Sequence, residues 1–317
     1  MDQLVDTVRS IAQRLAATDA QQREAAAAAK RLAVRVEPVP LHDVTVAGVD
    51  GGLVKRSLHG MDCLLVRAAA ASFHYRDGGV AQVRYYPSRF PPPQPEVPEG
   101  LSEGEWQSFA SLRRLREETG TAIAALEALR PTVLLMDGLL APHPLDRPSP
   151  RMEALYQEVI RNYTTLYGLA VRHGIGLAGI VEDSRSAVFC DFLRGQGVPV
   201  PATARDTSFL SFLLDQGERT PPMAWPEVET FFLRTARDDR PLRVDYLPKT
   251  IPLARLAGLL LSVSGQHKGY GFPAPLIEAD QVAKLAEEEM DAFSSRLVAL
   301  CRGLPGALRL RRDQRPF

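Results

Sequence analysis

The sequence contains little cysteine, carries no net charge and has no long hydrophobic run. Its three cysteines (Cys63, Cys190 and Cys301) are far apart among 317 residues, and no two have the spacing of a metal site. This usage excludes a disulfide scaffold and predicts reduced thiols, as in cytoplasmic proteins. The most apolar run, Leu256–Val263, is much shorter than the ~20 residues that span a bilayer, and no signal-peptide pattern follows Met1. We therefore expect a cytoplasmic protein without membrane contact.

The charge balance narrows the classes of function. The 38 Lys and Arg residues equal the 38 Asp and Glu residues, which excludes a protein coated in positive charge but permits a local basic groove for nucleic acid. The chain has no G-x-x-x-x-G-K-[ST] sequence, so the pattern predicts no P-loop for ATP. Hydrophobic residues make up 45% of the chain, which is enough to form a folded core.

Residue periodicity predicts an α/β fold. Apolar residues at helical spacing predict one helix over residues 2–34, or two helices with a break near Asp19. The proline-rich residues 87–98 are expected to lack regular structure. Further helices are expected at 103–129 and 151–172, and strands at 43–50, 63–75, 79–86, 132–137 and 175–181. Three antiparallel strands followed by helix-linked parallel strands are typical of a ribonuclease H-like mixed sheet flanked by helices.

Composition divides the chain into three segments. They are an N-terminal helical segment (1–40), the α/β domain (41–300) and an arginine-rich C-terminal tail (301–317). Proline pairs interrupt the pattern of the domain at about 200–265, where we expect an insertion. Within this insertion Leu256–Val263 is expected to form a strand, and residues 277–300 are expected to form the final helix.

Two aspartates end predicted strands. Asp50 closes the first strand before Gly51-Gly52, and Asp137 closes the fourth before Gly138. If these strands are neighbours, both carboxylates emerge side by side at one edge of the sheet. Asp-Gly is also a common turn dipeptide, so an ordinary structural turn is the alternative at each position.

The helix between these strands carries a third acidic candidate. Glu118 falls on the core-facing apolar stripe of this helix, whereas Glu117 is turned toward solvent. A buried Glu needs a partner, which is either a metal ion shared with Asp50 and Asp137 or an arginine such as Arg114. Converging carboxylates repel one another unless a cation lies between them, and an all-oxygen ligand set favours Mg²⁺ or Mn²⁺.

Four motifs in register resemble those of the NurA family of DNA nucleases. They are VAGVDGG with LLVRAAA (46–52 and 64–70), VLLMDG (133–138), GIVEDSRS (179–186) and GFPAPLIEAD (271–280). The resemblance implies a ribonuclease H-like nuclease domain, a homodimer, and hydrolysis of DNA phosphodiesters with two Mn²⁺ or Mg²⁺ ions. It also implies single-strand endonuclease and 5′–3′ exonuclease activity in end resection during double-strand break repair, together with a HerA-type hexameric ATPase.

The resemblance assigns catalysis and metal binding residue by residue. Asp50, Glu118 and Asp137 match the metal-binding carboxylates of the family, and Asp280 stands where the family usually has histidine. Because aspartate also binds hard cations, Asp280 is expected to act as the fourth ligand. We expect Asp50 to bridge two ions, with Asp137 and Glu118 on one ion and Asp280 on the other.

Contact with DNA requires positive charge that the neutral total conceals. Lys55 and Arg56 are expected in the loop after Asp50, close enough to hold a phosphate. In GIVEDSRS the family often has lysine at the position of Glu182, and Arg185 is the candidate substitute; Asp183 is expected to cap the helix that follows. Between Tyr246 and Ile277 there is no Asp or Glu, and the residues expected to contact the DNA backbone or its bases are Lys249, Lys268, Tyr270 and Phe272. Ordinary surface solvation is the alternative for each of these cations.

Two other classes of protein remain open. A non-catalytic DNA-binding or adaptor subunit would explain the departures from the family pattern at Glu182, at Asp280 and at Phe272, where tyrosine is usual. An actin-like phosphotransferase also places Asp-Gly turns near phosphate. That fold requires a second set of three strands in the C-terminal half, which the sequence does not show.

Overall fold

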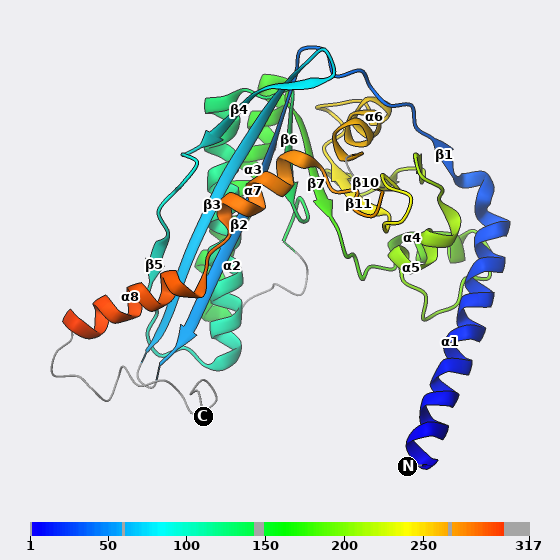
Figure 1. Cartoon of the computed structure of the whole chain (residues 1–317), viewed down its shortest axis with the longest axis horizontal. Helices are drawn as coiled ribbons and strands as arrows, with labels where there is room; N and C mark the ends of the chain where they lie inside the picture. Colours follow the sequence, from blue (N-terminus) through cyan, green and yellow to red (C-terminus); the bar gives the residue numbers. More distant parts are fainter. Residues whose placement is uncertain (1, 59–60, 143–148, 266–267, 301–317) are drawn as a thin grey trace. The chain divides into compact units, whose positions relative to one another are not determined.

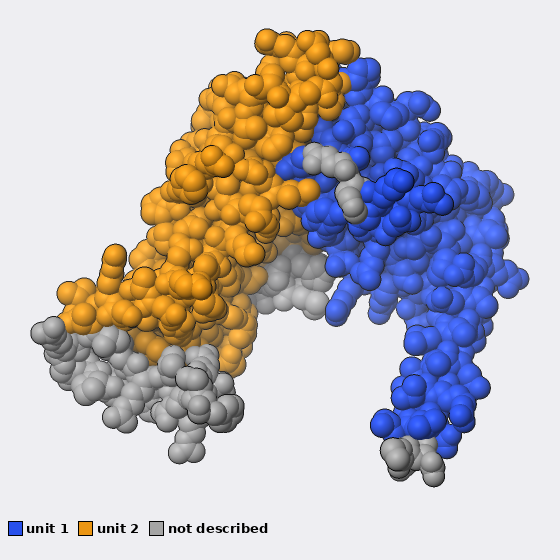
Figure 2. Space-filling view, viewed as in Figure 1, with its two compact units in different colours: residues 1–40, 179–274 blue, residues 41–178, 275–317 orange. Residues whose placement is uncertain are grey.

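The computed structural model describes residues 2–58, 61–142, 149–265 and 268–300 (Figure 1). The chain divides into two compact units, which are coloured separately in Figure 2. Unit 1 consists of Met1–Pro40 and Gly179–Ala274, and unit 2 consists of Leu41–Ala178 and Pro275–Phe317. Residues 1–40 therefore share a unit with the second half of the chain. No helix among the described residues is long and apolar enough to cross a membrane.

The strands of unit 2 belong to a mixed sheet with the order β7-β6-β2-β3-β4, in which β7 begins in unit 2 and ends in unit 1. These strands are β2 (Val44–Ser57), β3 (Asp62–Arg76), β4 (Gly79–Tyr86), β6 (Val133–Asp137) and β7 (Gly176–Val181). β2, β3 and β4 are antiparallel, and β6 runs parallel to β2. The Asp77-Gly78 turn joins β3 to β4 with positive φ angles of 51° and 81°. The ribonuclease H-like mixed sheet is thereby confirmed.

Helices cover both faces of this sheet. α2 (Glu103–Leu129) and α3 (Glu153–His173) lie behind the strands in Figure 1, whereas α7 (Ala274–Ala283) and α8 (Glu287–Leu300) cross in front of them. The 3-10 turn η3 (Pro150–Met152) leads into α3. A capping box starts α2, since the Ser102 hydroxyl accepts a hydrogen bond from the Glu105 amide and the Glu105 carboxylate accepts one from the Ser102 amide.

Three predictions for unit 2 are wrong. β2 does not stop at Gly51-Gly52 but pairs with β3 as far as Ser57, because the continuous hydrogen-bond ladder outweighs the weak strand preference of glycine. The proline-rich segment contains a short strand, β5 (Gln94–Glu96), which pairs with β3 at an edge where proline is tolerated. The final helix is two helices, since the Lys284 carbonyl accepts a hydrogen bond from Arg67 (3.0 Å) instead of one from the next helical turn.

Unit 1 combines short antiparallel strands with four helices among its described residues. The helices are α1 (Asp2–Ala29), α4 (Val188–Gly195), α5 (Asp206–Leu213) and α6 (Leu253–Ser264), and the 3-10 turn η1 (Lys30–Leu32) follows α1. The strands, in the order β1-β8-β10-β11 with β9 beside β10, are β1 (Val34–Arg35), β8 (Glu218–Arg219), β9 (Met223–Ala224), β10 (Glu229–Leu233) and β11 (Leu242–Tyr246). α1 is unbroken, so of the two N-terminal alternatives the single helix is present.

Two predictions for unit 1 are also wrong. Leu256–Val263 lies in helix α6 and not in a strand, because a short apolar run with both faces buried has no period that separates the two structures. Asp183 does not cap α4 but pairs with Arg240 (2.7 Å) at the surface. The Asp206 carboxylate takes over this role and accepts hydrogen bonds from the amides of Phe189 (3.1 Å) and Cys190 (3.0 Å).

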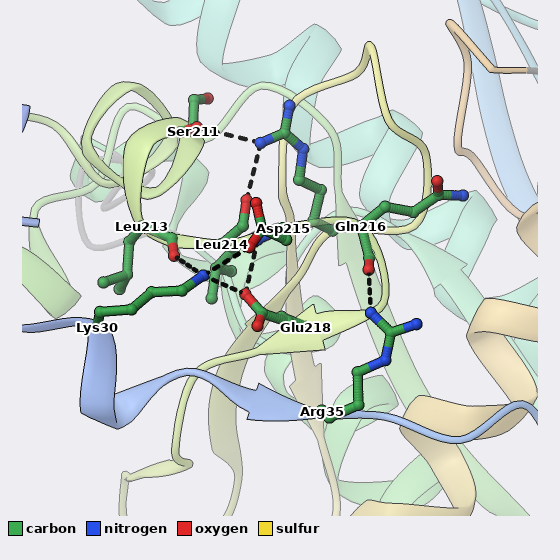
Figure 3. A network of polar contacts seen from close by, with 9 residues as sticks. Lys30, Arg35, Ser211, Leu213, Leu214, Asp215, Gln216 and Glu218 are labelled. Carbon is green, nitrogen blue, oxygen red and sulfur yellow. Dashed lines mark hydrogen bonds and ion pairs between the residues drawn. The ribbon is translucent and has the colours of Figure 1, made fainter. Parts of the chain in front are cut away.

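A network of polar contacts fixes the end of α1 within unit 1 (Figure 3). The Lys30 ammonium donates to Asp215 (2.9 Å), to Glu218 (2.7 Å) and to the Leu213 carbonyl (2.9 Å). On β1, the Arg35 guanidinium donates to the Gln216 carbonyl (2.7 Å). The turn that leads into β8 is thereby tied to the C-terminal end of α1.

Candidate active site

Two buried carboxyl groups lie side by side on neighbouring strands of unit 2. The parallel register of β2 and β6 pairs Val49 with Met136, so Asp50 and Asp137 are the next residues along the two strands. Asp50 is 5% exposed, and its Oδ1 accepts a hydrogen bond from the Gly51 amide (2.6 Å). The two carboxyl groups are close enough for each to act on the pKa of the other. The structure thus brings together the two aspartates that the sequence places at strand ends.

The two glycines after Asp50 allow other elements to approach β2 closely. A Cβ atom on Gly51 would lie 3.2 Å from Glu118 Oε2 on α2. On the opposite face, a Cβ atom on Gly52 would lie 2.3 Å from the Ala283 carbonyl oxygen at the end of α7. Because residues alternate between faces along a strand, Asp50 points to the same face as Gly52. The glycine pair is therefore a packing feature and not the predicted turn.

Glu118 enters the site from the opposite side. Its side chain is 1% exposed, which confirms that it faces inward on α2, whereas Glu117 is partly exposed and bonds to Gln94 (2.6 Å). The Glu118 carboxylate pairs with Arg114 one turn earlier (3.3 Å), and Arg114 also donates to the Gly51 carbonyl (3.3 Å). The arginine partner weighed in the sequence analysis is thus present.

Acidic side chains outnumber basic ones in this cluster. Burial raises the pKa of Asp50, and burial followed by the charge of Asp50 raises the pKa of Asp137 to about 7. Burial also raises the pKa of Glu118 well above its ordinary value. Asp280, an exposed residue of α7, adds a further negative charge that acts on Asp50 and Asp137. Although burial lowers the pKa of Arg114, the attraction of Glu118, Asp50 and Asp137 outweighs it and raises that pKa.

A cavity of about 210 Å³ opens beside these groups. Its polar lining comes from Arg114, Asp137, Ser111 on α2 and Tyr163 on α3. The Tyr163 hydroxyl donates to the Leu139 carbonyl (3.2 Å) just after β6, which ties α3 to the chain that follows Asp137. The cavity therefore places one guanidinium and one carboxyl group at the same small opening.

The comparisons with known proteins decide the family. The sequence profile of the NurA domain matches residues 44–285, which is most of the chain. The chain belongs to the NurA family. No curated protein matches the chain.

Solved NurA structures share the fold of this family member at low sequence identity. The NurA nuclease from Sulfolobus solfataricus superimposes with a TM-score of 0.64 at 16% identity, over 96% of this chain and 100% of that one. A NurA structure with manganese gives a TM-score of 0.58 at 11% identity, over 96% and 100% of the two chains. A NurA structure bound to dAMP and manganese gives 0.56 at 11%, over 87% and 92%. At these identities the likeness establishes the fold.

The donor chemistry of this NurA chain suits a hard divalent cation, but the side chains as placed do not form a finished metal site. Carboxylate oxygens are the ligands that Mg²⁺ and Mn²⁺ prefer. Across the described residues, no three His, Cys, Asp or Glu side chains are grouped closely enough to hold a metal ion. The Glu118 carboxylate is instead held by Arg114.

Two predicted DNA contacts in unit 2 lie on β2 and not in a loop. Lys55 points toward α2 and donates to Gln107, whereas Arg56 points toward α8 and pairs with Glu287 (3.1 Å) and Asp291 (2.6 Å). The predicted loop position is wrong because β2 continues past Asp50. Successive strand residues face opposite ways, so Lys55 and Arg56 do not form one phosphate-binding surface.

The other predicted DNA contacts belong to unit 1. Arg185, Lys249 and Lys268 are exposed there. The Tyr270 and Phe272 rings are 6.3 Å apart, but Phe272 is only 7% exposed, whereas Tyr270 presents its ring to solvent. A stacking role for Phe272 is therefore wrong, because the side chain is part of the core. The arginine-rich tail from residue 301 lies outside the described residues.

Arg114 has a more central place in the site than its sequence position indicates. It was named in the sequence analysis only as an alternative partner of Glu118, but it interacts with all three buried carboxyl groups and lines the adjacent cavity. Its spacing of four residues before Glu118, on the inward face of the same helix, is the signal that could have indicated this position.

Proposed function

We propose that this NurA-family chain is a metal-dependent deoxyribonuclease that hydrolyses DNA phosphodiesters. The observation that carries the proposal is the pair of buried carboxyl groups of Asp50 and Asp137 on adjacent parallel strands. Burying two acidic groups beside a third, Glu118, costs folding free energy that a purely structural role does not explain. Asp50, Glu118, Asp137 and Asp280 are the proposed metal ligands, and Mn²⁺ or Mg²⁺, with two ions per site, is the proposed cofactor.

In this proposal the carboxylates of the site bind the cations, and the arginine binds phosphate. Bound divalent cations would lower the pKa of the attacking water and stabilise the leaving oxygen. Asp50, Asp137 and Asp280 would hold them from one face of the sheet, and Glu118 would join them after leaving Arg114. The Arg114 guanidinium is then available to the cavity beside Asp137, where it would bind and orient a phosphate of the DNA backbone.

The biological setting is proposed from the family alone. We place the chain in the cytoplasm as a homodimer with single-strand endonuclease and 5′–3′ exonuclease activity, working in DNA end resection with a HerA-type hexameric ATPase. The solved relative bound to dAMP and manganese supports a nucleotide and Mn²⁺ as ligands. The absence of a P-loop sequence in this chain is consistent with ATP hydrolysis by a separate partner.

Asp50→Asn tests the proposal. We expect the variant to fold and to lose Mn²⁺-dependent cleavage of single-stranded and duplex DNA by about 10³-fold or more, since the amide cannot replace an anionic metal ligand. Asp245→Asn, which changes a buried aspartate of unit 1 that pairs with Arg243, is the matched control and should remain active. An Asp50→Asn protein that cleaves as fast as the wild type, free of contaminating nuclease, would disprove the assignment.

A catalytically inactive DNA-binding or adaptor subunit is the second candidate. The Arg114–Glu118 ion pair favours it, because a Glu118 carboxylate that is already paired with an arginine needs no metal ion as its partner. The two functions are separated by comparing cleavage in Mn²⁺ with DNA binding in EDTA. Binding in EDTA without cleavage in either Mn²⁺ or Mg²⁺ would establish the second function.

A further inference from the structure

Helix α1 carries one apolar stripe along its whole length. Counting from Leu4, the stripe repeats at alternating steps of four and three residues, which is the heptad spacing of helices that pack side by side. Its members are Leu4, Val8, Ile11, Leu15, Thr18, Gln22, Ala25 and Ala29. A stripe this regular predicts a partner helix along all of its length.

The second half of the stripe has its partner within unit 1. Gln22, Ala25 and Ala29 are buried where α1 packs against α5. The Ser208 hydroxyl of α5 donates to the Gln22 side chain (3.3 Å), and Arg23 stacks over the Phe212 ring at 4.3 Å. With the Lys30 network beyond it (Figure 3), this half of α1 is firmly held.

The first half of the stripe is exposed although it is the more apolar half. Leu4, Val8, Ile11 and Leu15, with Val5 beside them, are between 42% and 69% exposed. Figure 2 shows this part of α1 standing out from the rest of unit 1. Asp6 and Arg9 pair with each other (3.2 Å) away from the stripe, so the charges of this segment leave the apolar face clear. Five large apolar side chains aligned on one face form a patch typical of an interaction site.

We propose that the exposed half of α1 packs against the same segment of a second copy of this chain, antiparallel to it. In this arrangement Leu4 lies opposite Leu15 of the second copy, and Val8 lies opposite its Ile11, so the same four side chains bury one another. The second copy's helix then covers the stripe up to the point where α5 takes over. The inference deepens the proposed homodimer by naming its contact, and it does not depend on cleavage.

Two observations favour the antiparallel over the parallel orientation. In a parallel pair the second halves of both helices would lie at the same level, where each already carries its own α5 on the stripe. An antiparallel pair places the two α5 helices at opposite ends. The residues beside the stripe also fit an antiparallel pair. On one side of the stripe Val5 and Ala12 would face the same two apolar residues of the second copy. On the other side Thr7 and Arg14 would face the same two polar residues, so that no like charges oppose each other.

Sedimentation equilibrium of the full chain tests the contact. Ile11→Asp should weaken self-association by about tenfold or more, because a carboxylate would be buried in the apolar seam. Gln13→Asp places the same charge on the outer face of α1 and should leave self-association unchanged. Circular dichroism and nuclease assays on both variants keep loss of fold or of catalysis separate from loss of assembly. Equal association constants for wild type and Ile11→Asp would overturn the proposal.

Disulfide cross-linking tests the orientation. Cys63 and Cys190 are buried, so Cys301→Ser gives a background suited to single introduced cysteines. A mixture of Leu4→Cys and Leu15→Cys chains should form a cross-linked dimer on oxidation, whereas Leu4→Cys alone should not. Cross-linking of Leu4→Cys with itself would show a parallel pair and overturn the antiparallel assignment.

Discussion

Two clusters of charged residues in this molecule shift the pKa values of their acidic side chains in opposite directions. In unit 1, Lys30 faces Asp215 and Glu218 at a half-exposed surface. There the hydrogen bond to Lys30 lowers the pKa of Asp215. For Lys30 itself, the hydrogen bonds to Glu218 and Asp215 outweigh burial and raise the pKa. In unit 2, burial raises the pKa values of Asp50, Glu118 and Asp137 around a single Arg114.

The difference separates a structural ion pair from a candidate site. At the Lys30 network the charged forms of Lys30 and Asp215 are stabilised, so folding and the ionisation of these two groups favour each other. In the carboxylate cluster ionisation opposes folding, because acids outnumber the guanidinium and water is excluded. A cation that binds to such a cluster stabilises the ionised carboxylates. Perturbed acids gathered in this way are typical of functional sites.

After Asp50→Asn, the largest effect should come from substituting Glu118. Glu118→Gln removes the charge that both a metal ion and Arg114 would use, and we expect Mn²⁺-dependent cleavage to fall by about 10²–10³-fold. Glu117→Gln is the matched control, since this neighbour lies on the outer side of α2 and bonds only to Gln94 in the described contacts. Single-turnover cleavage of a labelled oligonucleotide measures both variants. Equal losses in both would remove the distinction between the two sides of α2.

The pH dependence of stability should have opposite signs in the two clusters. The pKa of Asp137 rises from its usual 3.8 to about 7 on folding, so between these values the folded state binds more protons than the unfolded state. The free energy of unfolding of the metal-free protein should therefore decrease by roughly 2–4 kcal/mol as the pH rises from about 4 to about 7. The lowered pKa of Asp215 acts the other way, since its contribution is retained above its ordinary pKa and lost as the pH falls.

Urea denaturation in EDTA across this pH range measures the dependence. Asp137→Asn should flatten the decrease, and Mn²⁺ should stabilise the wild-type protein more at pH 7.5 than at pH 5.5, because protons compete for the same oxygens. A wild-type curve that rises steadily between pH 4 and pH 7 would contradict the raised pKa of the buried Asp137 carboxyl group.

The smallest effect is expected at the Lys30 network. Lys30→Met should lower the free energy of unfolding by about 1 kcal/mol, since a partly exposed ion pair is screened by solvent, and the loss should shrink at high salt. Arg31→Met, at the next and exposed position, should have almost no effect. Neither change should alter cleavage. A loss of activity in Lys30→Met with unchanged stability would mean that this network is not merely structural.

Much of unit 2 could be predicted from the sequence because its signals are local. The capping box at Ser102, the Asp77-Gly78 turn and the inward position of Glu118 each depend on residues within a few positions of one another. The same reasoning failed where two structures satisfy the local pattern equally well. Leu256–Val263 is apolar on all sides and forms a helix, and Gly51-Gly52 continues a strand although glycine pairs usually mark turns.

The sequence by itself determined the acidic candidates, the order of the core elements and the heptad stripe of α1, because spacing and residue chemistry are properties of the chain. Only the tertiary structure decided that Asp50 and Asp137 are buried side by side with raised pKa values, that Arg114 holds Glu118, and that half of the α1 stripe is already covered. These outcomes depend on which strands pair and how closely helices approach them. The packing of residues far apart in the chain sets those distances, and burial at those distances sets the charge.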